Sequence, residues 1–317
     1  MPATLIQKSG HLDVYDVRIK NQWLMTYGKA ANEFERIYGL DSITTEDTRT
    51  SWQTGFGLAV ETGENEAFTY DTITQGYDTT CTPYQYTLGY QVSEIAVEDD
   101  QNAGIIKGPA LAAAHADAIR ESVEQLAIGP LNSPTSTTGF SPWMSGGDGV
   151  ALLSTSHPFP GGGVFSNKPS TDCDISPAAL EAAQINLAKT PNPRSQIRGL
   201  VGKTLVVPPD SQFLAQKILF TTKQIPFSAD YTSNPVADGI QLEVLSRLVV
   251  GSGLWLLLAN KAKSFGQHGH TLTWVWRVRP QFGRDNVFAT GARQYKARFR
   301  AGMYYPDPRG VYGSTGV

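Results

Sequence analysis

The segment from Gly108 to Ile128 is the strongest helix signal in the sequence, and it limits the folds that the chain can adopt. Pro109 suits a first helical turn, alanine dominates the next two turns, and Gly129-Pro130 ends the pattern. At about 1.5 Å per residue, such a helix is a rod of roughly 30 Å. Its apolar stripe consists of Ala112, Ala116, Ile119, Val123 and Leu126. We therefore expect a spine helix that joins two differently built halves. The charged residues Arg120, Glu121 and Glu124 lie off the stripe and are expected on a solvated face.

The two halves of the chain carry opposite charge. Positions 41–100 hold twelve carboxylates and one basic residue, Arg49, whereas positions 261–300 hold nine basic residues and one carboxylate, Asp285. Complementary patches of this kind set the register and the choice of partner between surfaces. The row Lys296, Arg298 and Arg300 leaves three interpretations open: the solvated face of an edge strand, a protein interface, or a surface for nucleic acid phosphates.

The N-terminal third predicts one helix and one hairpin. Apolar residues at helical spacing predict a helix from Gln22 to Tyr38 that docks on another part of the chain. Alternation around Phe68 and Tyr70, and again over 84–92, predicts two strands of a long acidic hairpin that turns near 74–83. An isolated two-stranded ribbon is marginal in water, so this hairpin is expected to lie on another, basic surface.

The rest of the chain alternates short strands and helices. A Ser cap followed by Pro177 predicts a helix over 176–188, and a second helix is expected near 211–219. Strands are expected in five places: 204–207, 240–244, 254–259, 271–279 and 295–301. These elements predict an α+β protein.

Composition narrows the function classes. The net charge of −3 gives no sign of wholesale nucleic-acid binding, and the two cysteines, Cys81 and Cys173, indicate a reducing compartment. The N-terminus lacks the apolar core of a signal peptide, and the longest apolar run, near 254–259, is too short to span a membrane. We expect a soluble protein made in the cytoplasm, with no membrane partner.

Three chemical motifs are weak. The segment 199–204 lacks the first glycine of a phosphate-binding loop and leads into a strand. Ser154, Ser156 and His157 are residue types of a hydrolase, but the strained Gly-x-Ser-x-Gly turn is absent, so His157 is expected in a turn. His268 and His270 have no third metal ligand nearby and indicate a solvated hairpin tip. We expect no enzyme activity, no cofactor and no metal.

Several short motifs follow one another along the chain. These are the segments 148–158, 162–167, 180–183, 205–209, 254–256, 295–302 and 307–310. In this order, they resemble the major capsid proteins of tailed bacteriophages, in the branch that includes the major head subunits of Mu-like phages. The resemblance covers roughly residues 100–317.

This resemblance implies the capsid fold first described for phage Hong Kong 97 (HK97). Its parts map onto the chain as an N-terminal arm (1–45), an extended two-stranded loop (46–100), a peripheral domain with the spine helix (101–200), an axial domain (201–262) and a return to the peripheral domain (263–317). No long charged helical segment precedes the arm, so an uncleaved fused scaffold is not expected.

The implied function is structural. Copies are expected to form pentamers and hexamers that close an icosahedral virion shell around double-stranded DNA, with portal, scaffolding and cement proteins as further partners. Two alternatives are an encapsulin-like nanocompartment shell and, in another class, a hydrolase that uses Ser154 or Ser156. The candidate intersubunit contacts are the acids Glu61, Glu64, Glu66 and Asp71, the helix residues Arg120, Glu121 and Glu124, and the basic residues Arg277, Arg279, Arg298 and Arg300.

Overall fold

The computed structural model describes residues 9–29, 31–93, 95–96, 108–138, 146–220, 239–248, 253–262, 269–287 and 289–317. The chain divides into two compact units. The first contains residues 1–32, 84–126 and 276–301, and the second contains residues 33–83, 127–275 and 302–317. Strands β10 (Thr273–Asn286) and β11 (Arg293–Tyr304) run along the chain from one unit into the other.

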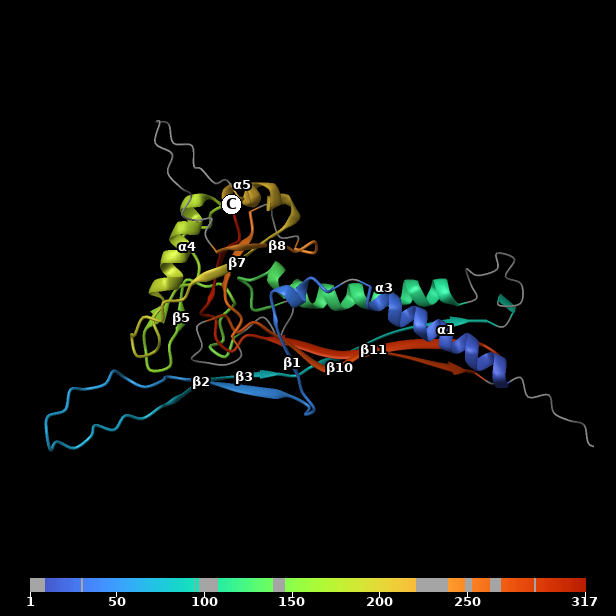
Figure 1. Ribbon diagram of the computed structural model, residues 1–317, viewed down its shortest axis with the longest axis horizontal. Coiled ribbons are helices and arrows are strands. Elements are labelled where there is room, and N and C mark those ends of the chain that lie inside the picture. Colours follow the sequence, from blue (N-terminus) through green and yellow to red (C-terminus); the bar gives the residue numbers. More distant parts are fainter. Residues whose placement is uncertain are drawn as a thin grey trace, which may run out of the picture. The chain divides into compact units, whose positions relative to one another are not determined.

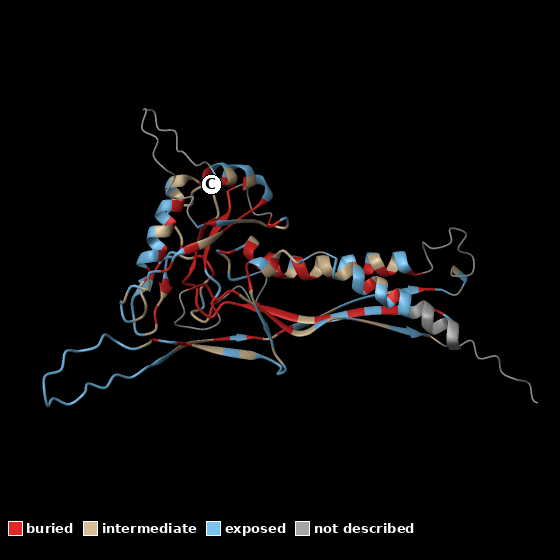
Figure 2. Ribbon diagram, in the orientation of Figure 1, coloured by how far each residue is buried: buried red, intermediate tan, exposed pale blue. Residues whose placement is uncertain are grey.

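The first unit consists of two helices on a sheet (Figure 1). Strand β4 (Tyr84–Val92) pairs antiparallel with β11, in a sheet of order β1-β10-β11-β4 that also includes β1 (Gly39–Ser42). One face of β4 and β11 is aromatic, because the rings of Tyr86 and Phe299, and of Tyr90 and Tyr295, stack on facing positions. Figure 2 shows the buried residues concentrated along β11 and on one side of α3.

The spine helix is confirmed as α3 (Pro109–Ile128). Ala112, Ala116, Ile119 and Val123 of the predicted stripe are buried, each at most 1% exposed. The predicted solvated face is wrong at one position, since Glu124 is only 3% exposed. Glu124 lies beside the inaccessible residues Val123, Ala127 and Ile128, whereas Gln125 of the same turn is exposed.

The N-terminal helix begins earlier than the sequence predicts. Helix α1 spans Ser9–Tyr27, and the described residues from 31 to 38 contain one helical element, the 3-10 turn η1 (Phe34–Arg36). The prediction of a helix from Gln22 to Tyr38 is therefore wrong in its bounds. The chain leaves the helix at Gly28, whose low helix propensity favours an end there. Its apolar residues still serve the expected purpose, because Trp23 and Phe34 are fully buried.

The second unit is built around a sheet of order β12-β9-β7-β8. Its strands are β7 (Gly202–Val207), β8 (Gln241–Val244), β9 (Trp255–Ala259) and β12 (Val311–Ser314). Helices α4 (Pro177–Lys189) and α5 (Gln212–Phe220) pack on it, and α5 follows the 3-10 turn η3 (Pro209–Ser211). The shared core includes Leu180, Leu187, Leu205, Trp255 and Leu257. Strands β7, β8 and β9 and both helices confirm the sequence prediction, whereas β12 was not predicted. The cap of α4 is also confirmed, since the Ser176 hydroxyl accepts a hydrogen bond from the Ala179 N–H.

The acidic hairpin exists, but its strands are not the predicted ones. Strand β2 (Thr48–Gln53) pairs antiparallel with β3 (Gln75–Cys81), and residues 54–74 form an extended ribbon between them that carries no strand. The predicted pairing of 68–70 with 84–92 is wrong, because β4 pairs with β11 instead. The alternation of apolar and polar residues in β4 indicates that one face of the strand is buried, but it does not indicate which strand is its neighbour.

The base of the hairpin lies on a platform of loops between 146 and 167. These loops contain the two-residue strands β5 (His157–Pro158) and β6 (Val164–Phe165). Earlier in the chain, the 3-10 turn η2 (Gly129–Asn132) follows α3. Trp52 of β2 packs with Phe159, Phe165 and Tyr77 in a small aromatic core. The hairpin therefore has an anchored base, while its ribbon of residues 54–74 is exposed. Among the described helices, none is long and apolar enough to cross a membrane.

Candidate assembly interface

The open face of strands β4, β11 and β10 is polar and basic. Because side chains alternate along a strand, the stacking of Tyr90 on Tyr295 places their neighbours Gln91 and Lys296 on the opposite face. That face, which we call the basic face, also holds Arg298, whose Nη2 donates to Gln281 Oε1 at 3.3 Å. Its charged residues and polar neighbours are Gln85, Thr87, Gln91, Arg277, Arg279, Gln281, Asp285, Gln294, Lys296, Arg298 and Arg300.

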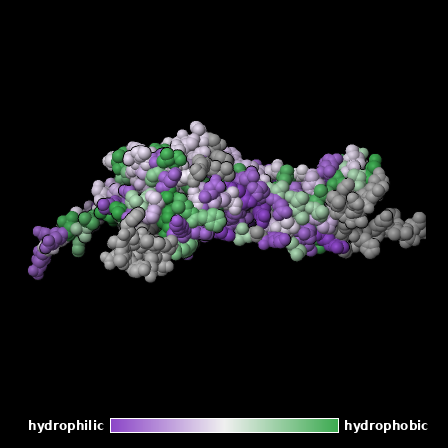
Figure 3. All heavy atoms as spheres, turned by 90° about the horizontal axis from the view of Figure 1, so that it is seen from above, coloured by the Kyte–Doolittle hydropathy of each residue, from purple (hydrophilic) through white to green (hydrophobic). Residues whose placement is uncertain are grey.

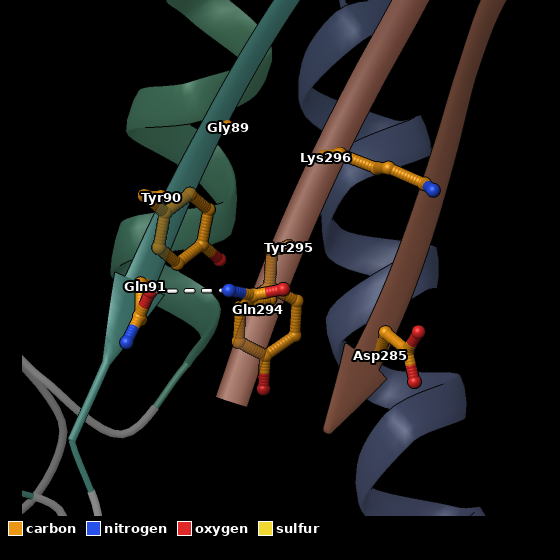
Figure 4. A pocket seen from close by; sticks show the side chains of 7 residues that line it. All are labelled: Gly89, Tyr90, Gln91, Asp285, Gln294, Tyr295 and Lys296. Atoms are coloured by element: carbon orange, nitrogen blue, oxygen red, sulfur yellow. Dashed lines mark hydrogen bonds between the residues drawn. The ribbon is translucent and has the colours of Figure 1, made fainter. Parts of the chain in front are cut away.

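Two hollows open on the basic face, on either side of Lys296. The first, about 320 Å³, is lined by residues of all three strands, and the second, about 640 Å³, shares Gly89 and Lys296 with it. Figure 4 shows the first hollow: the Lys296 side chain extends from β11 toward β10, where Asp285 lies, and Gln294 donates to Gln91 Oε1 at 3.1 Å. Gly89 lines both hollows, and Gly283 lines the second. At Gly89, a Cβ atom would lie 3.0 Å from the Tyr295 carbonyl oxygen.

The predicted arginines of this face differ in exposure. Arg279 is exposed, with its Cζ atom 5.8 Å from the centroid of the Trp276 ring, and Arg298 is exposed beside Gln281. Arg277 and Arg300 are half-buried. The structure thus brings predicted basic residues into one sheet, and it adds Lys296, which lies between the two hollows and which the sequence identified only as part of a basic row.

The four predicted acids all lie in the ribbon 54–74, but they are not equivalent. Asp71 is used within its own chain: it accepts hydrogen bonds from the Gly57 N–H at 2.6 Å and from Arg194 Nη2 at 3.2 Å. The Gly57 and Thr72 N–H groups, and then Arg194, lower the pKa of Asp71. Glu66 accepts from the Gly63 N–H at 2.9 Å, which closes the ribbon tip. Glu61 and Glu64 are exposed at that tip.

The ribbon also exposes large apolar side chains, a feature that the sequence analysis missed. Phe56, Leu58, Val60, Phe68 and Tyr70 are 60–90% exposed. Figure 3 shows green hydrophobic and purple hydrophilic residues together on this projecting segment, with the purple at its end. The alternation of Phe56, Leu58 and Val60 with small residues was the available signal. Contiguous apolar surface of this kind marks a site that another molecule covers.

The three candidate contact residues on α3 also differ in exposure. Arg120 and Glu121 of α3 are half-buried, whereas Glu124 is buried. Arg120 and Glu121 are therefore accessible enough for a partner to contact them, whereas Glu124 is not.

The residues considered for catalysis are used structurally. His157 is fully buried at the start of β5 and not in a turn, and its Nδ1 atom lies 2.7 Å from Asp148 Oδ2. Its Nε2 atom lies 3.2 Å from Asn167 Oδ1. Both ring nitrogens are therefore occupied, and the Ser154 hydroxyl instead accepts a hydrogen bond from the Ser156 N–H at 3.1 Å. The geometry gives neither serine a base.

The two other weak motifs also have structural explanations. Lys203 and Thr204 lie inside β7, so no helix N-terminus follows the 199–204 loop to hold a phosphate. His270 is buried, and burial followed by the charge of Lys261 lowers its pKa to about 3. His268 lies outside the described residues. Within the described part of the chain, no group of three His, Cys, Asp or Glu side chains is placed to hold a metal ion.

In the first unit, a long helix lies on a sheet whose other face is basic, and in the second unit the ribbon 54–74 exposes large apolar side chains. Exposed apolar surface of this kind is typical of protein–protein contact sites. The comparisons agree. The family model described as "Phage capsid protein" matches residues 76–314, and the chain belongs to this family. No curated protein matches the sequence.

Solved structures show the same fold at low identity. The chain is similar to the capsid protein of Myoviridae phage XM1, at 12% identity and a TM-score of 0.53, over 91% of this chain and 92% of that one. It is similar to the virus-like particle of Pyrococcus furiosus, at 10% identity and a TM-score of 0.53, over 95% of this chain and 99% of that one. It is also similar to the capsid of Ralstonia phage GP4, at 13% identity and a TM-score of 0.51, over 87% of this chain and 84% of that one.

These matches confirm the α+β capsid fold of the HK97 type. The protein is a structural protein, a major capsid subunit and a component of the virion, and the family match favours this function over a nanocompartment shell.

Proposed function

We propose that copies of this chain form homopentamers and homohexamers in the host cytoplasm and close an icosahedral shell around double-stranded DNA. Portal, scaffolding and cement proteins would complete the particle, and the protein itself would catalyse no reaction. The ribbon carries this proposal: five large apolar side chains at 60–90% exposure have no core of their own, so a second molecule must cover them. Repeated modest contacts of this kind are what a symmetric shell uses.

We propose the following division of labour along the chain. Residues 1–45 are the N-terminal arm, 46–100 contain the extended loop, 101–200 are the peripheral domain with the spine helix, 201–262 are the axial domain, and 263–317 return to the peripheral domain. The pairing of β2 with β3 supports an extended loop whose reaching part is the ribbon 54–74.

The ribbon of one copy is proposed to lie on the basic face of a neighbour. The ribbon 54–74 contains four carboxylates and no basic residue, whereas the basic face presents Arg277, Arg279, Lys296, Arg298 and Arg300 against Asp285. Glu61 and Glu64 are the best candidates for contact with the neighbour, since Asp71 already binds Arg194 of its own chain. Such charge pairs fix register and the choice of partner.

Charge reversal tests this contact. Glu61→Lys with Glu64→Lys is expected to abolish particles in negative-stain electron microscopy, and Lys296→Glu with Arg298→Glu is expected to do the same. Combining both pairs should restore particles. Glu181→Lys, an exposed acid on α4 outside the ribbon, is the matched control and should assemble normally. Failure of the combined variant to assemble, with each single pair folded, would refute the ribbon contact.

Particle size and content test the proposed shell. Large particles that protect double-stranded DNA from nuclease support the phage head, and small particles that enclose protein cargo would favour the nanocompartment.

A further inference from the structure

His115 of α3 connects three elements of the first unit. Trp23 of α1 donates its indole N–H to His115 Nδ1 at 3.2 Å. On the other side of the ring, His115 Nε2 lies 3.1 Å from the carbonyl oxygen of Leu88 in β4. Trp23 is fully buried and His115 is 6% exposed, so the hydrogen bond between them is shielded from water, while the bond to Leu88 is partly buried.

These two bonds require a single protonation state. The indole nitrogen can only donate, so His115 Nδ1 must offer a lone pair. A carbonyl oxygen can only accept, so Nε2 must carry the hydrogen. The contacts are therefore satisfied only by the neutral imidazole with its hydrogen on Nε2.

The surroundings also disfavour a charge on His115. The rings of Tyr90 and Phe282 meet it edge-on, with centroids 5.2 and 6.0 Å away, and Trp23 stacks on both Tyr27 and Phe282. Burial lowers the pKa of His115, and the bond to the Leu88 carbonyl only partly opposes this effect.

We propose that His115 is an acid-sensitive latch, in which a proton on Nδ1 releases the N-terminal helix α1 from α3 and the sheet. A proton there replaces the acceptor of the Trp23 N–H with a second donor, which leaves two N–H groups facing each other in a buried site. Trp23 then leaves the aromatic cluster, and α1 separates with it. The latch rests on the fold of one chain and is independent of the shell arrangement.

The lowered pKa of His115 determines the direction in which pH changes the stability of the latch. Because the folded chain binds the proton less readily than the unfolded chain, the latch stabilises the docked helix fully above the ordinary histidine range, near pH 6.5. This contribution is lost as the pH falls below that value toward the lowered pKa of the folded state.

Among the described residues, three tyrosines belong to the ring cluster around His115. Tyr27 on α1 stacks on Trp23, Tyr90 on β4 meets the imidazole edge-on, and Tyr295 on β11 stacks on Tyr90. On α3 itself, the positions three and four residues away are apolar: Leu111, Ala112, Ala118 and Ile119. Among the described residues, no carboxylate forms an ion pair with His115.

Hydrogen exchange of the full chain tests the latch. The protection of residues 17–27 in α1, corrected for intrinsic exchange, is expected to fall on the order of tenfold from about pH 7.5 to about pH 5, as a buried hydrogen bond is replaced by unpaired donors. In His115→Asn, whose amide cannot titrate, protection should be the same at both pH values. Trp23→Phe keeps a ring but removes the donor, so it should weaken docking at high pH and reduce the pH dependence.

Helix α4 (Pro177–Lys189) is the internal reference, since general acid unfolding would expose it as well. The latch is refuted if α1 in the wild-type protein has the same protection at both pH values, if the loss persists in His115→Asn, or if α4 loses protection in parallel. If His115→Asn does not fold, Trp23→Phe tests the latch instead: an undiminished pH dependence of protection in α1 of this variant would refute it.

Discussion

Arg309 lies over the indole ring of Trp52, with 4.8 Å between its Cζ atom and the ring centroid. The same guanidinium donates to Asp307 through Nε, at 2.8 and 3.0 Å, and through Nη2, at 2.6 Å. Trp52 belongs to β2, and Arg309 lies just before β12. A buried ion pair near the C-terminus therefore supports the base of the projecting hairpin.

Replacing Arg309 by Leu should destabilise the second unit strongly. The change leaves the Asp307 carboxylate, only 3% exposed, with Arg198 at 3.6 Å as its remaining ion-pair partner. Removing one member of a buried pair costs about 3–5 kcal/mol. Urea unfolding of the unassembled subunit measures this loss.

The matched control is Arg36→Leu, which removes an exposed pair with Glu243 and should cost less than about 1 kcal/mol. Equal losses in both variants would contradict a supporting role for Arg309.

Polar substitution in the ribbon should separate assembly from folding. Leu58→Ser with Val60→Ser changes side chains that are 82% and 65% exposed, so the stability of the unassembled subunit should change by less than about 0.5 kcal/mol. The yield of particles should fall, because the apolar contact with the neighbour is lost. Thr69→Ser, an exposed change in the same ribbon, is the control. Normal particle yield from the double variant would show that these side chains stay uncovered in the shell.

The two cysteines should differ in reactivity. Burial raises the pKa of Cys81 to about 12, and its thiol donates to the Met303 carbonyl at 3.7 Å. Cys173 is half-buried. Since the thiolate is the reactive form, alkylation of the native protein should label Cys173 and spare Cys81 until the chain unfolds. Peptide mass spectrometry after a timed reaction reads this directly, and equal labelling at both sites would contradict it.

Asp78 should stabilise the hairpin in a pH-dependent way. Hydrogen bonds from Ser51, and then from Arg49 and Gln75, lower its pKa to about 2. A carboxyl with a lowered pKa stabilises the folded state above its ordinary value, near 3.8, and this contribution disappears as the pH falls toward 2.

Titration of the Trp52 environment by NMR should therefore show the hairpin loosening in that acidic window. Asp78→Asn should lack this step and have a looser hairpin at neutral pH. A wild-type hairpin that stays unchanged down to about pH 2 would argue against this role of Asp78.

Local sequence determined the elements whose signals are local. The alanines and the proline of α3, the Ser176 cap of α4 and the continuous apolar runs of β7 and β9 each specify one element, and the structure confirms all four. The separation of acidic from basic residues along the chain was also evident from the sequence, because the charge of these residue types does not depend on tertiary contacts.

Only the tertiary structure decided which partners these elements take. Strand β4 alternates equally well beside β3 or β11, and the stacking of Tyr86 on Phe299 resolves the choice. Glu124 is charged yet buried, because it lies beside Val123, Ala127 and Ile128 on the covered side of the last turn of α3. Only the tertiary structure shows that His157 contacts Asp148 and Asn167, while His115 accepts a hydrogen bond from Trp23. These outcomes depend on residues distant in the chain, which no local pattern encodes.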